Sequence, residues 1–319
     1  MIQQLTVIMY HYVRELPKTR YPDIKGLLVS EFEYQLEYLK KEYNFIRIED
    51  CINAFINNHD LPPNSCLLTF DDGYIDHFEN VFPLLKDNNI QGCFFPPARA
   101  IIKSEVLDVN KIHFILAAMS NELHRLLEDV YDYLDEFRSD WKLRSNKYYY
   151  SKLAEASRFD PPEIIFIKRL LQAELDEKLR NIITNKLFAK YVTNDEKSFS
   201  KELYMNVDHL KFMLNDGMYV GSHGYHHYWL DKLAKEKQEI EIVRSLDFLK
   251  SLGAPTLDWV MCYPYGAYNN TLIDLLKDSG CALAFTTEVG HAQIKKENAF
   301  TIQRFDTNDF PPVSNKIYS

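Results

Sequence analysis

Short apolar runs that alternate with segments of helical periodicity are the feature that most constrains this fold. Residues 5–12 and 66–70 are rich in Leu, Val, Ile and Phe, which is typical of buried strands. Between them, Ser30 as N-cap and Glu33 as its capping-box partner predict the start of a helix. Strand and helix signals in alternation favour an α/β fold with a mainly parallel sheet.

The same alternation continues along most of the chain. It predicts helices at 51–58, 81–86, 234–252 and 270–279, and strands at 91–95, 217–221, 258–263 and 281–286. The segment 105–205 differs, because it is charged, rich in aromatic residues and nearly free of Gly and Pro, with helical patterning over 123–137 and 164–184. We therefore expect a discontinuous α/β domain at 1–104 and 206–319, interrupted by a helical insertion at 105–205.

Composition restricts the function classes. The 319 residues are 46% hydrophobic and 26% charged, as in ordinary globular proteins. A net charge of −9 disfavours nucleic acid as a partner, because a phosphate backbone attracts basic proteins. Five widely spaced cysteines without a Cys-x-x-Cys pair disfavour a disulfide framework and favour a reducing compartment.

The N-terminal residues and the hydropathy pattern bear on location. Residues 1–10 lack a basic n-region and a small-residue cleavage site, so we interpret them as a first strand and not as a signal peptide. No apolar run approaches the ~18–20 residues that cross a bilayer. We therefore expect no transmembrane segment and a cytoplasmic location.

The first motif whose side chains could catalyse a reaction or bind a ligand is Thr69-Phe70-Asp71-Asp72-Gly73-Tyr74, at the end of a predicted strand. Adjacent side chains of an extended chain point to opposite faces, so one carboxylate can bind a cation while the other holds or removes a proton. Gly73 permits a tight turn. The alternative is an acidic turn in which an Asp caps a helix.

The second motif is Gly221-Ser222-His223-Gly224-Tyr225-His226-His227. His223 and His227, at i and i+4, can share one face of a helical turn. Two His and one carboxylate, with open positions left over, are typical of a catalytic metal. His226 is a rival ligand, and a surface His cluster or a helix start is the alternative.

The third motif is Met261-Cys262-Tyr263-Pro264-Tyr265-Gly266, which follows another predicted strand. A backbone N–H in such a loop can stabilise a developing oxyanion. Taken alone, the motif is better explained as an ordinary Pro-Tyr-Gly turn. All three motifs, however, lie at the predicted C-terminal ends of strands, where α/β barrels place their chemistry.

Together these motifs resemble those of the polysaccharide deacetylase family, also called NodB-homology or carbohydrate esterase family 4 proteins. The family motif T-F-D-D-G-[YF] matches residues 69–74 throughout, and H-[ST]-x-x-H matches at His223 and His227, with Gly224 in place of Ser/Thr. Met9-Tyr10-His11 and residues 263–266 resemble the branch that deacetylates poly-N-acetylglucosamine. The resemblance covers about residues 5–100 and 205–305, and implies a distorted (β/α) barrel of the NodB-homology type with a helical insertion.

The resemblance also implies residue roles. Asp72, His223 and His227 would bind a divalent metal ion, most often Zn²⁺, and Asp71 would be the general base that takes a proton from the attacking water. The backbone N–H of Tyr265 would help to hold the oxyanion. The products would be an amine and a carboxylate.

Two departures from the family pattern leave roles to be filled. Many members have an Arg that orients the base, but Cys262 occupies its place here, and Arg304 is a possible substitute. A late L-x-H motif, whose His protonates the leaving amine, is missing. His291 is the candidate for this catalytic role, although a lone loop His is more often solvated. His11, at a predicted strand end, is a further candidate for a contact to substrate or to another site residue. The candidate substrate contacts are His11, Tyr263, Pro264, Tyr265 and Arg304.

The leading hypothesis is metal-dependent hydrolysis of an N-acetyl or N-formyl group on an amino sugar. The expected cytoplasmic location favours a nucleotide- or lipid-linked intermediate of surface polysaccharide biosynthesis over finished wall polymer. The alternatives are a deacylase of a non-sugar amide, and a non-catalytic carbohydrate-binding module on the same fold. The insertion is either a lid or substrate-binding wall, or a subdomain that covers the barrel side or forms an oligomer contact.

Overall fold

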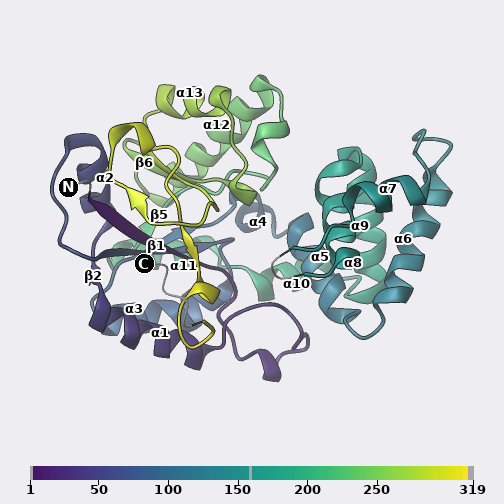
Figure 1. The fold of residues 1–319 in the computed structure, drawn as a ribbon, viewed down its shortest axis with the longest axis horizontal. Coiled ribbons are helices and arrows are strands. Elements are labelled where there is room, and N and C mark those ends of the chain that lie inside the picture. The colour runs from purple at the N-terminus through teal and green to yellow at the C-terminus, as the bar shows by residue number, and fades with distance from the viewer. Residues whose placement is uncertain (1–2, 158–159, 315–319) are drawn as a thin grey trace. The chain divides into compact units, whose positions relative to one another are not determined.

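The computed structural model describes residues 3–157 and 160–314 as a mixed α/β structure (Figure 1). The chain forms two compact units. The first, the barrel unit, is the described part of Met1–Glu15, Gly26–Glu105 and Ser200–Ser319. The second, the helical unit, is the described part of Leu16–Lys25 and Val106–Phe199. The sequence pattern did not indicate that Leu16–Lys25 would belong with the helices.

The strands of the barrel unit confirm the α/β class. Four parallel strands are adjacent in the order β5 (Tyr219–Val220), β4 (Gly92–Phe95), β3 (Ser65–Asp71) and β1 (Gln4–Tyr10). The short strand β2 (Asn44–Phe45) pairs with β3. Two further short strands, β8 (Ala292–Gln293) and β9 (Phe305–Asp306), pair with β1. A second sheet pairs β6 (Trp259–Cys262) with β7 (Cys281–Phe285). Isolated bridges Ser222–Met261 and Phe285–Ile302 join the two sheets into a distorted barrel.

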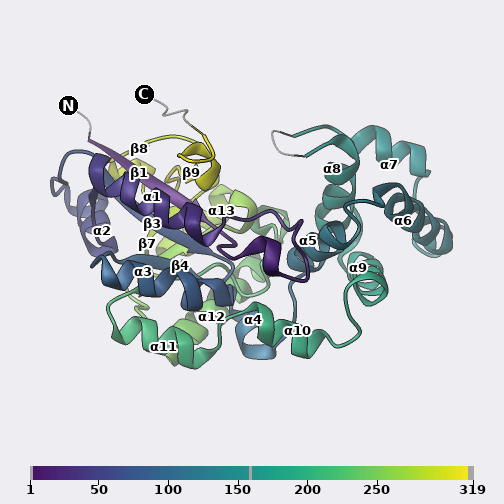
Figure 2. The same ribbon diagram turned by 90° about the horizontal axis from the view of Figure 1, so that it is seen from below.

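Helices surround these strands and make up the second unit (Figures 1 and 2). Those of the barrel unit are α1 (Val29–Glu42), α2 (Ile48–Asn57), α3 (Phe82–Asp87), α4 (Ala98–Lys103), α11 (Val207–Asn215), α12 (Lys235–Leu252) and α13 (Asn270–Asp278). Those of the helical unit are α5 (Asp108–Ala118), α6 (Leu123–Phe137), α7 (Asn146–Leu153), α8 (Pro162–Arg169) and α9 (Glu177–Tyr191), while α10 (Glu196–Leu203) contains residues of both units.

Two helix boundaries differ from the expectation. The N-cap of α1 is Leu28 and not Ser30, because Leu28 is extended and its N–H donates to Glu31 Oε2 at 2.9 Å, while Ser30 is already helical. The expected helix at 164–184 is interrupted, because Leu175 is extended and Asp176 caps a new helix, α9.

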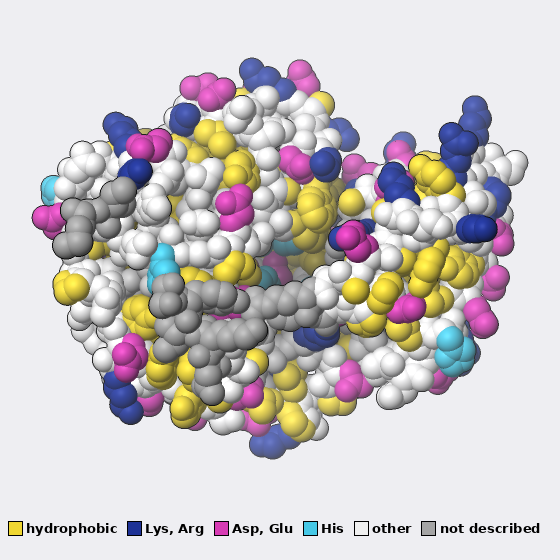
Figure 3. Space-filling view, viewed as in Figure 1, with side chains coloured by type: hydrophobic (Ala, Val, Ile, Leu, Met, Phe, Trp, Pro, Cys, Tyr) yellow, Lys and Arg dark blue, Asp and Glu magenta, His cyan; other side chains and the backbone are white. Residues whose placement is uncertain are grey.

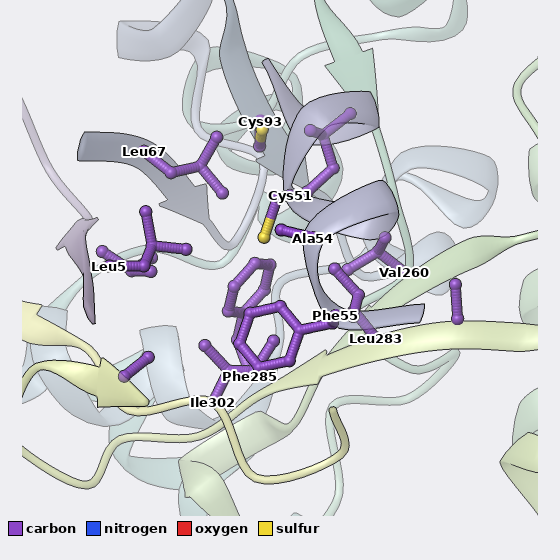
Figure 4. Packing of buried hydrophobic residues seen from close by; sticks show 14 of the residues in the cluster. Leu5, Cys51, Ala54, Phe55, Leu67, Cys93, Val260, Leu283, Phe285 and Ile302 are labelled. Carbon is purple, nitrogen blue, oxygen red and sulfur yellow. The ribbon is translucent and has the colours of Figure 1, made fainter. Parts of the chain in front are cut away.

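The barrel core follows the alternation of side chains along each strand. Its members include Leu5, Val7, Leu67, Cys93, Phe95, Val260, Cys262, Leu283 and Phe285, to which α2 adds Cys51, Ala54 and Phe55 (Figure 4). Residues two apart on a strand share a face, so Thr69 and Asp71 continue the inward row that Leu67 begins on β3. The apolar core therefore gives way to polar groups at the C-terminal ends of the strands.

The helical unit has its own apolar core and polar anchors. Leu126, Val130 and Leu134 form the buried face of α6. Buried Asp160 forms ion pairs with both Lys25 and Lys168 and so connects the Leu16–Lys25 segment to the helices.

Acidic and basic side chains are interspersed over the face drawn in Figure 3. Within the described residues, no helix combines the length and apolarity needed to cross a membrane.

Candidate active site

The three motifs meet at one end of the barrel. Asp71 is the last residue of β3, His223 is the third residue after β5, and Cys262 is the last residue of β6. These three strands run parallel through the β3–β4–β5 pairings and the Ser222–Met261 bridge, so their C-terminal ends share an edge.

The turn after β3 redirects the second carboxylate of the pair. Asp72 has φ of 71° and Gly73 has φ of 68°, both in the left-handed region. A Cβ on Gly73 would lie 2.7 Å from Pro96 Cβ, so both backbone conformation and space require glycine there. A strictly extended chain would point Asp72 away from Asp71, whereas this turn brings it to the two histidines.

Asp72, His223 and His227 form a group whose ligand atoms all lie within 4.8 Å of one another. Asp72 Oδ1 is 3.5 Å from His223 Nε2 and 3.2 Å from His227 Nε2. All three residues are at most 7% exposed. The other oxygen of Asp72, Oδ2, accepts a hydrogen bond of 2.6 Å from the Tyr74 hydroxyl.

The chemistry of this donor set fits a divalent cation. Among the described residues, buried Asp72 Oδ1 has no hydrogen-bond partner, although two imidazole nitrogens face it. His223 Nδ1 lies 2.7 Å from the Cys262 carbonyl oxygen, which only accepts, so Nδ1 carries a proton and Nε2 is the ring nitrogen left to bind a cation. Two imidazoles and one carboxylate leave coordination positions open, as catalytic sites do.

The segment that carries the histidines is a loop and not the helical turn that the i, i+4 spacing suggested. Gly224 and His227 both have positive φ, of 73° and 61°, which a helix does not allow. His226, the rival ligand, points elsewhere, because its Nδ1 is bonded to Glu241 on α12. The two rings that face Asp72 are therefore those of His223 and His227.

Arg304 has a different position from the substrate contact expected for it. It is 1% exposed and donates two hydrogen bonds to the Asp71 carboxylate, from Nη1 to Oδ1 at 3.0 Å and from Nη2 to Oδ2 at 2.8 Å. Its Nε donates to the Thr286 carbonyl at 2.8 Å, and Nη1 also donates to Thr69 Oγ1 at 3.0 Å. Arg304 therefore orients Asp71, the role for which the family pattern left a vacancy.

This pairing determines the charge of Asp71. Burial would raise the pKa of its carboxyl, but the Arg304 guanidinium, aided by His223, outweighs burial and holds the pKa at about 2. The Cys262 thiol also donates to Asp71, with Sγ 3.3 Å from each carboxylate oxygen. Burial raises the pKa of Cys262 and keeps that proton on sulfur. Asp71 is thus an ionised carboxylate held in one orientation.

The remaining candidate contacts divide into two groups. His11 is partly exposed and directly follows Tyr10, whose strand partner Phe70 directly precedes Asp71, so His11 lies at the same strand end as the carboxylate pair. Tyr265 is partly exposed with φ of 58°, and its ring lies 4.8 Å from that of His227. Tyr263 and Pro264 are buried, and the Tyr263 hydroxyl donates to the Phe300 carbonyl, so we do not propose them as substrate contacts.

The structure does not bring His291 to this site. Its Nδ1 is 3.1 Å from Thr6 Oγ1, beside the first half of β1. Thr6 pairs with Cys66, five residues before Asp71 on β3, which corresponds to about 16 Å along a strand. His291 lies far from Asp71 because β8, which directly follows it, pairs with the first residues of β1. We therefore do not retain His291 as the general acid.

Sequence reasoning missed several residues that support the site. Thr69 was detectable, because alternation along β3 puts it on the same face as Asp71. Glu241 gave a weaker signal, as a charged residue on the buried face of α12 beside Ile242 and Ser245. The thiol contact from Cys262 to Asp71 depends on β6 lying across the barrel from β3, which no local pattern reveals.

Comparisons with known proteins identify the family of the chain. The family model described as polysaccharide deacetylase matches residues 58–133 and 188–284, and the gap between the two matches falls in the helical unit. No curated protein sequence matches the chain significantly.

Solved structures share the fold over almost the whole chain. The Streptococcus pyogenes deacetylase PplD, solved with acetate, has a TM-score of 0.58 at 17% identity, covering 96% of this chain and 93% of its own. A de-N-acetylase from Aggregatibacter actinomycetemcomitans has 0.56 at 16% identity, covering 98% of each chain. IcaB from Ammonifex degensii has 0.54 at 19% identity, covering 94% and 90%.

At these identities the structural likeness concerns the fold, a distorted (β/α) barrel, while the family model covers more than half of the sequence. The matched stretches contain the residues 69–74 and 221–227 that build the carboxylate and imidazole cluster. The chain belongs to the polysaccharide deacetylase family.

Proposed function

We propose that the protein is a metal-dependent hydrolase that removes an N-acetyl or N-formyl group from an amino sugar. The observation that carries the proposal is that one buried site contains both a group of candidate metal ligands and a separately oriented carboxylate. Asp72, His223 and His227 converge on one point with an unsatisfied carboxylate oxygen, while Arg304 holds the Asp71 carboxylate close to His223 in one orientation.

The metal would be held by Asp72, His223 and His227, and when bound it supplies Lewis-acid polarisation of the amide carbonyl and lowers the pKa of a water. Zn²⁺ suits this nitrogen and oxygen donor set best. Tyr74 orients the Asp72 carboxylate by its hydrogen bond to Oδ2, and the Cys262 carbonyl orients the His223 ring.

Asp71 is the proposed general base. Its carboxylate, a ring nitrogen of His223 and Cys262 Sγ lie within 4.8 Å of one another, so a water beside the ligand set is within reach of Asp71. Arg304 and the Cys262 thiol restrict Asp71 to one orientation while it accepts the proton. The backbone N–H of Tyr265 is the proposed donor to the oxyanion that forms at the carbonyl.

His11 is the proposed general acid in place of His291. It directly follows β1, at the same barrel edge as Asp71, and its backbone carbonyl accepts a hydrogen bond of 2.8 Å from His77 Nε2. Its side chain is partly exposed at the strand end next to Asp71, where we expect it to deliver a proton to the departing amine.

The proposal extends to the group to which the amino sugar is attached. A nucleotide- or lipid-linked intermediate of surface polysaccharide biosynthesis is the substrate we would test first, against a free N-acetylglucosamine oligomer. Release of free amine from UDP-N-acetylglucosamine, from an undecaprenyl-linked N-acetyl sugar and from the oligomer would be compared under the same conditions.

The decisive experiment measures metal content and amine release together. Wild type is expected to hold about one equivalent of Zn²⁺ and to hydrolyse at least one N-acyl sugar, while Asp72→Ala and His223→Ala lose both. Asp71→Asn is expected to keep the metal and to lose about 10²–10⁴-fold in kcat, because only the base is removed. A wild type that binds no metal after reconstitution would overturn the proposal and favour a carbohydrate-binding module. Hydrolysis confined to non-sugar amides would favour the other alternative.

A further inference from the structure

A buried carboxylate on a neighbouring helix holds the loop between the two histidine ligands. Glu241, on α12, is 3% exposed and faces the loop that follows β5. Its Oε2 accepts the backbone N–H groups of Tyr225 at 3.0 Å and of His226 at 2.9 Å. Its Oε1 accepts the His226 ring Nδ1. One carboxylate therefore satisfies three donors within the five-residue segment that begins and ends with a ligand.

The loop needs such a support, because its backbone is unfavourable by itself. His227 adopts φ of 61°, a conformation that a non-glycine residue takes only when its surroundings impose it. Successive N–H groups that point at one oxygen form a small anion-binding concavity, which stabilises such a turn when a negative charge fills it. Glu241 fills this concavity and imposes the turn that aims His227 at Asp72.

Gly224 gives the loop no side-chain support from its own position. The family motif has Ser or Thr at this position, and such a hydroxyl can bond nearby backbone groups of its own loop. Gly224 has no side chain and adopts φ of 73°. A Cβ there would lie 3.5 Å from Glu241 Oε2, so the carboxylate lies directly against the position where the hydroxyl is missing.

We infer that Glu241 is a positioning residue for the metal site, acting through the backbone of Tyr225 and His226 on the placement of His223 and His227. This inference rests on the proposed function and deepens it, since it assigns the geometry of the ligand loop to a residue outside the family motifs. Glu241 itself is not a ligand, because all the contacts described for its carboxylate are to loop N–H groups and to His226.

The test compares Zn²⁺ affinity of the metal-free full-length protein in three variants. Glu241→Gln keeps the shape but loses the charge, and turns an NH₂ group toward a former acceptor position, so its Zn²⁺ affinity is expected to fall about 10-fold. Glu241→Ala removes all three bonds and is expected to lose up to about 100-fold, the range for residues that orient metal ligands. Glu239→Gln, on an exposed position of the same helix, is the matched control and is expected to bind Zn²⁺ as wild type does.

Amide hydrogen exchange of the metal-free protein gives a second readout that needs no activity. The N–H groups of Tyr225 and His226 are expected to exchange at least 10-fold faster in Glu241→Gln than in wild type, with no change in the strands. A merely structural role predicts the opposite pattern, a lower unfolding midpoint with unchanged Zn²⁺ affinity and unchanged loop exchange, and that result would overturn the inference.

His226→Ala separates positioning from direct ligation. It leaves both backbone bonds to Glu241, so its loss of Zn²⁺ affinity is expected to be smaller than that of Glu241→Ala. A loss as large as in His223→Ala would show that His226 is itself a ligand and would overturn the inference. If wild type binds no Zn²⁺, the proposed function fails. If wild type binds Zn²⁺ and Glu241→Gln binds it equally, only this inference fails.

Discussion

At the scale of single residues, the pair of Asp71 and Arg304 decides how the site responds to pH. The pKa of Asp71 is about 2 in the folded protein, below its ordinary value near 4 in an unfolded chain. A lowered folded-state pKa stabilises the fold above the unfolded value, and this contribution is lost as pH falls from about 4 to about 2. Asp71 therefore stays ionised through the neutral range.

Replacing Arg304 by Met should move the acid limb of the activity profile. Burial would then act on Asp71 without a compensating cation, so the pKa of Asp71 rises and kcat/KM at neutral pH is expected to fall about 10–100-fold. The pH profile of kcat/KM checks this, with Arg304→Lys as the control that keeps a charge but not the bidentate grip. An unchanged acid limb in Arg304→Met would contradict the assignment of Asp71 as the base.

Tyr74 offers a second prediction at this scale. Tyr74→Phe keeps the ring that stacks on Tyr12 but removes the hydroxyl bonded to Asp72 Oδ2. We expect Zn²⁺ affinity to fall about 10-fold with little change in fold, because an unoriented carboxylate is a poorer ligand. Tyr34→Phe, at an exposed position on α1, serves as the control in the same titration.

At the scale of elements, the turn after β3 depends on one glycine. Gly73→Ala would force a Cβ to within 2.7 Å of Pro96 and hold Ala at φ of 68°. Gly217→Ala meets the same backbone strain, with φ of 88°, but finds nothing within 4 Å. We expect Gly217→Ala to lower the free energy of unfolding by about 1–2 kcal/mol.

Gly73→Ala should cost about 1–3 kcal/mol more than Gly217→Ala, since it adds overpacking to the same strain. Urea unfolding of the two variants under metal-free conditions measures the difference directly. Equal losses would mean that β4 and its following Pro96 shift to accept the methyl group.

At the scale of the whole molecule, metal binding should stabilise one unit. All three ligands lie in the barrel unit, so Zn²⁺ at 100 times its Kd is expected to raise the free energy of unfolding of that unit by about 2.7 kcal/mol. Thermal unfolding with and without Zn²⁺ checks this, and Asp72→Ala should show no increase. A stabilisation of equal size in Asp72→Ala would place the bound metal elsewhere.

The sequence by itself determined the class of the fold and pointed to the residues of the candidate metal site. Strand and helix periods are local properties, so β3, β6, α6 and α12 were predicted nearly to their observed ends. The strand-end position of Asp71 and the spacing of His223 and His227 were likewise readable, because each motif is contiguous in the chain. The boundaries predicted for the insertion and the roles of these residues remain predictions.

Tertiary structure alone decided what surrounds those residues. Arg304 lies 233 residues from Asp71, and Glu241 lies on the helix that follows the histidine loop, so no contiguous motif predicts either contact. His291 follows the third motif closely in sequence, yet β8 pairs with the start of β1, far from the carboxylates. The left-handed turns at Asp72 and His227 also depend on neighbours that only the folded barrel supplies. The reactions that this site could support follow from its Asp and His side chains, which the sequence shows. The positions of those side chains follow from the pairing of the strands and from contacts with helix α12, which only the tertiary structure shows.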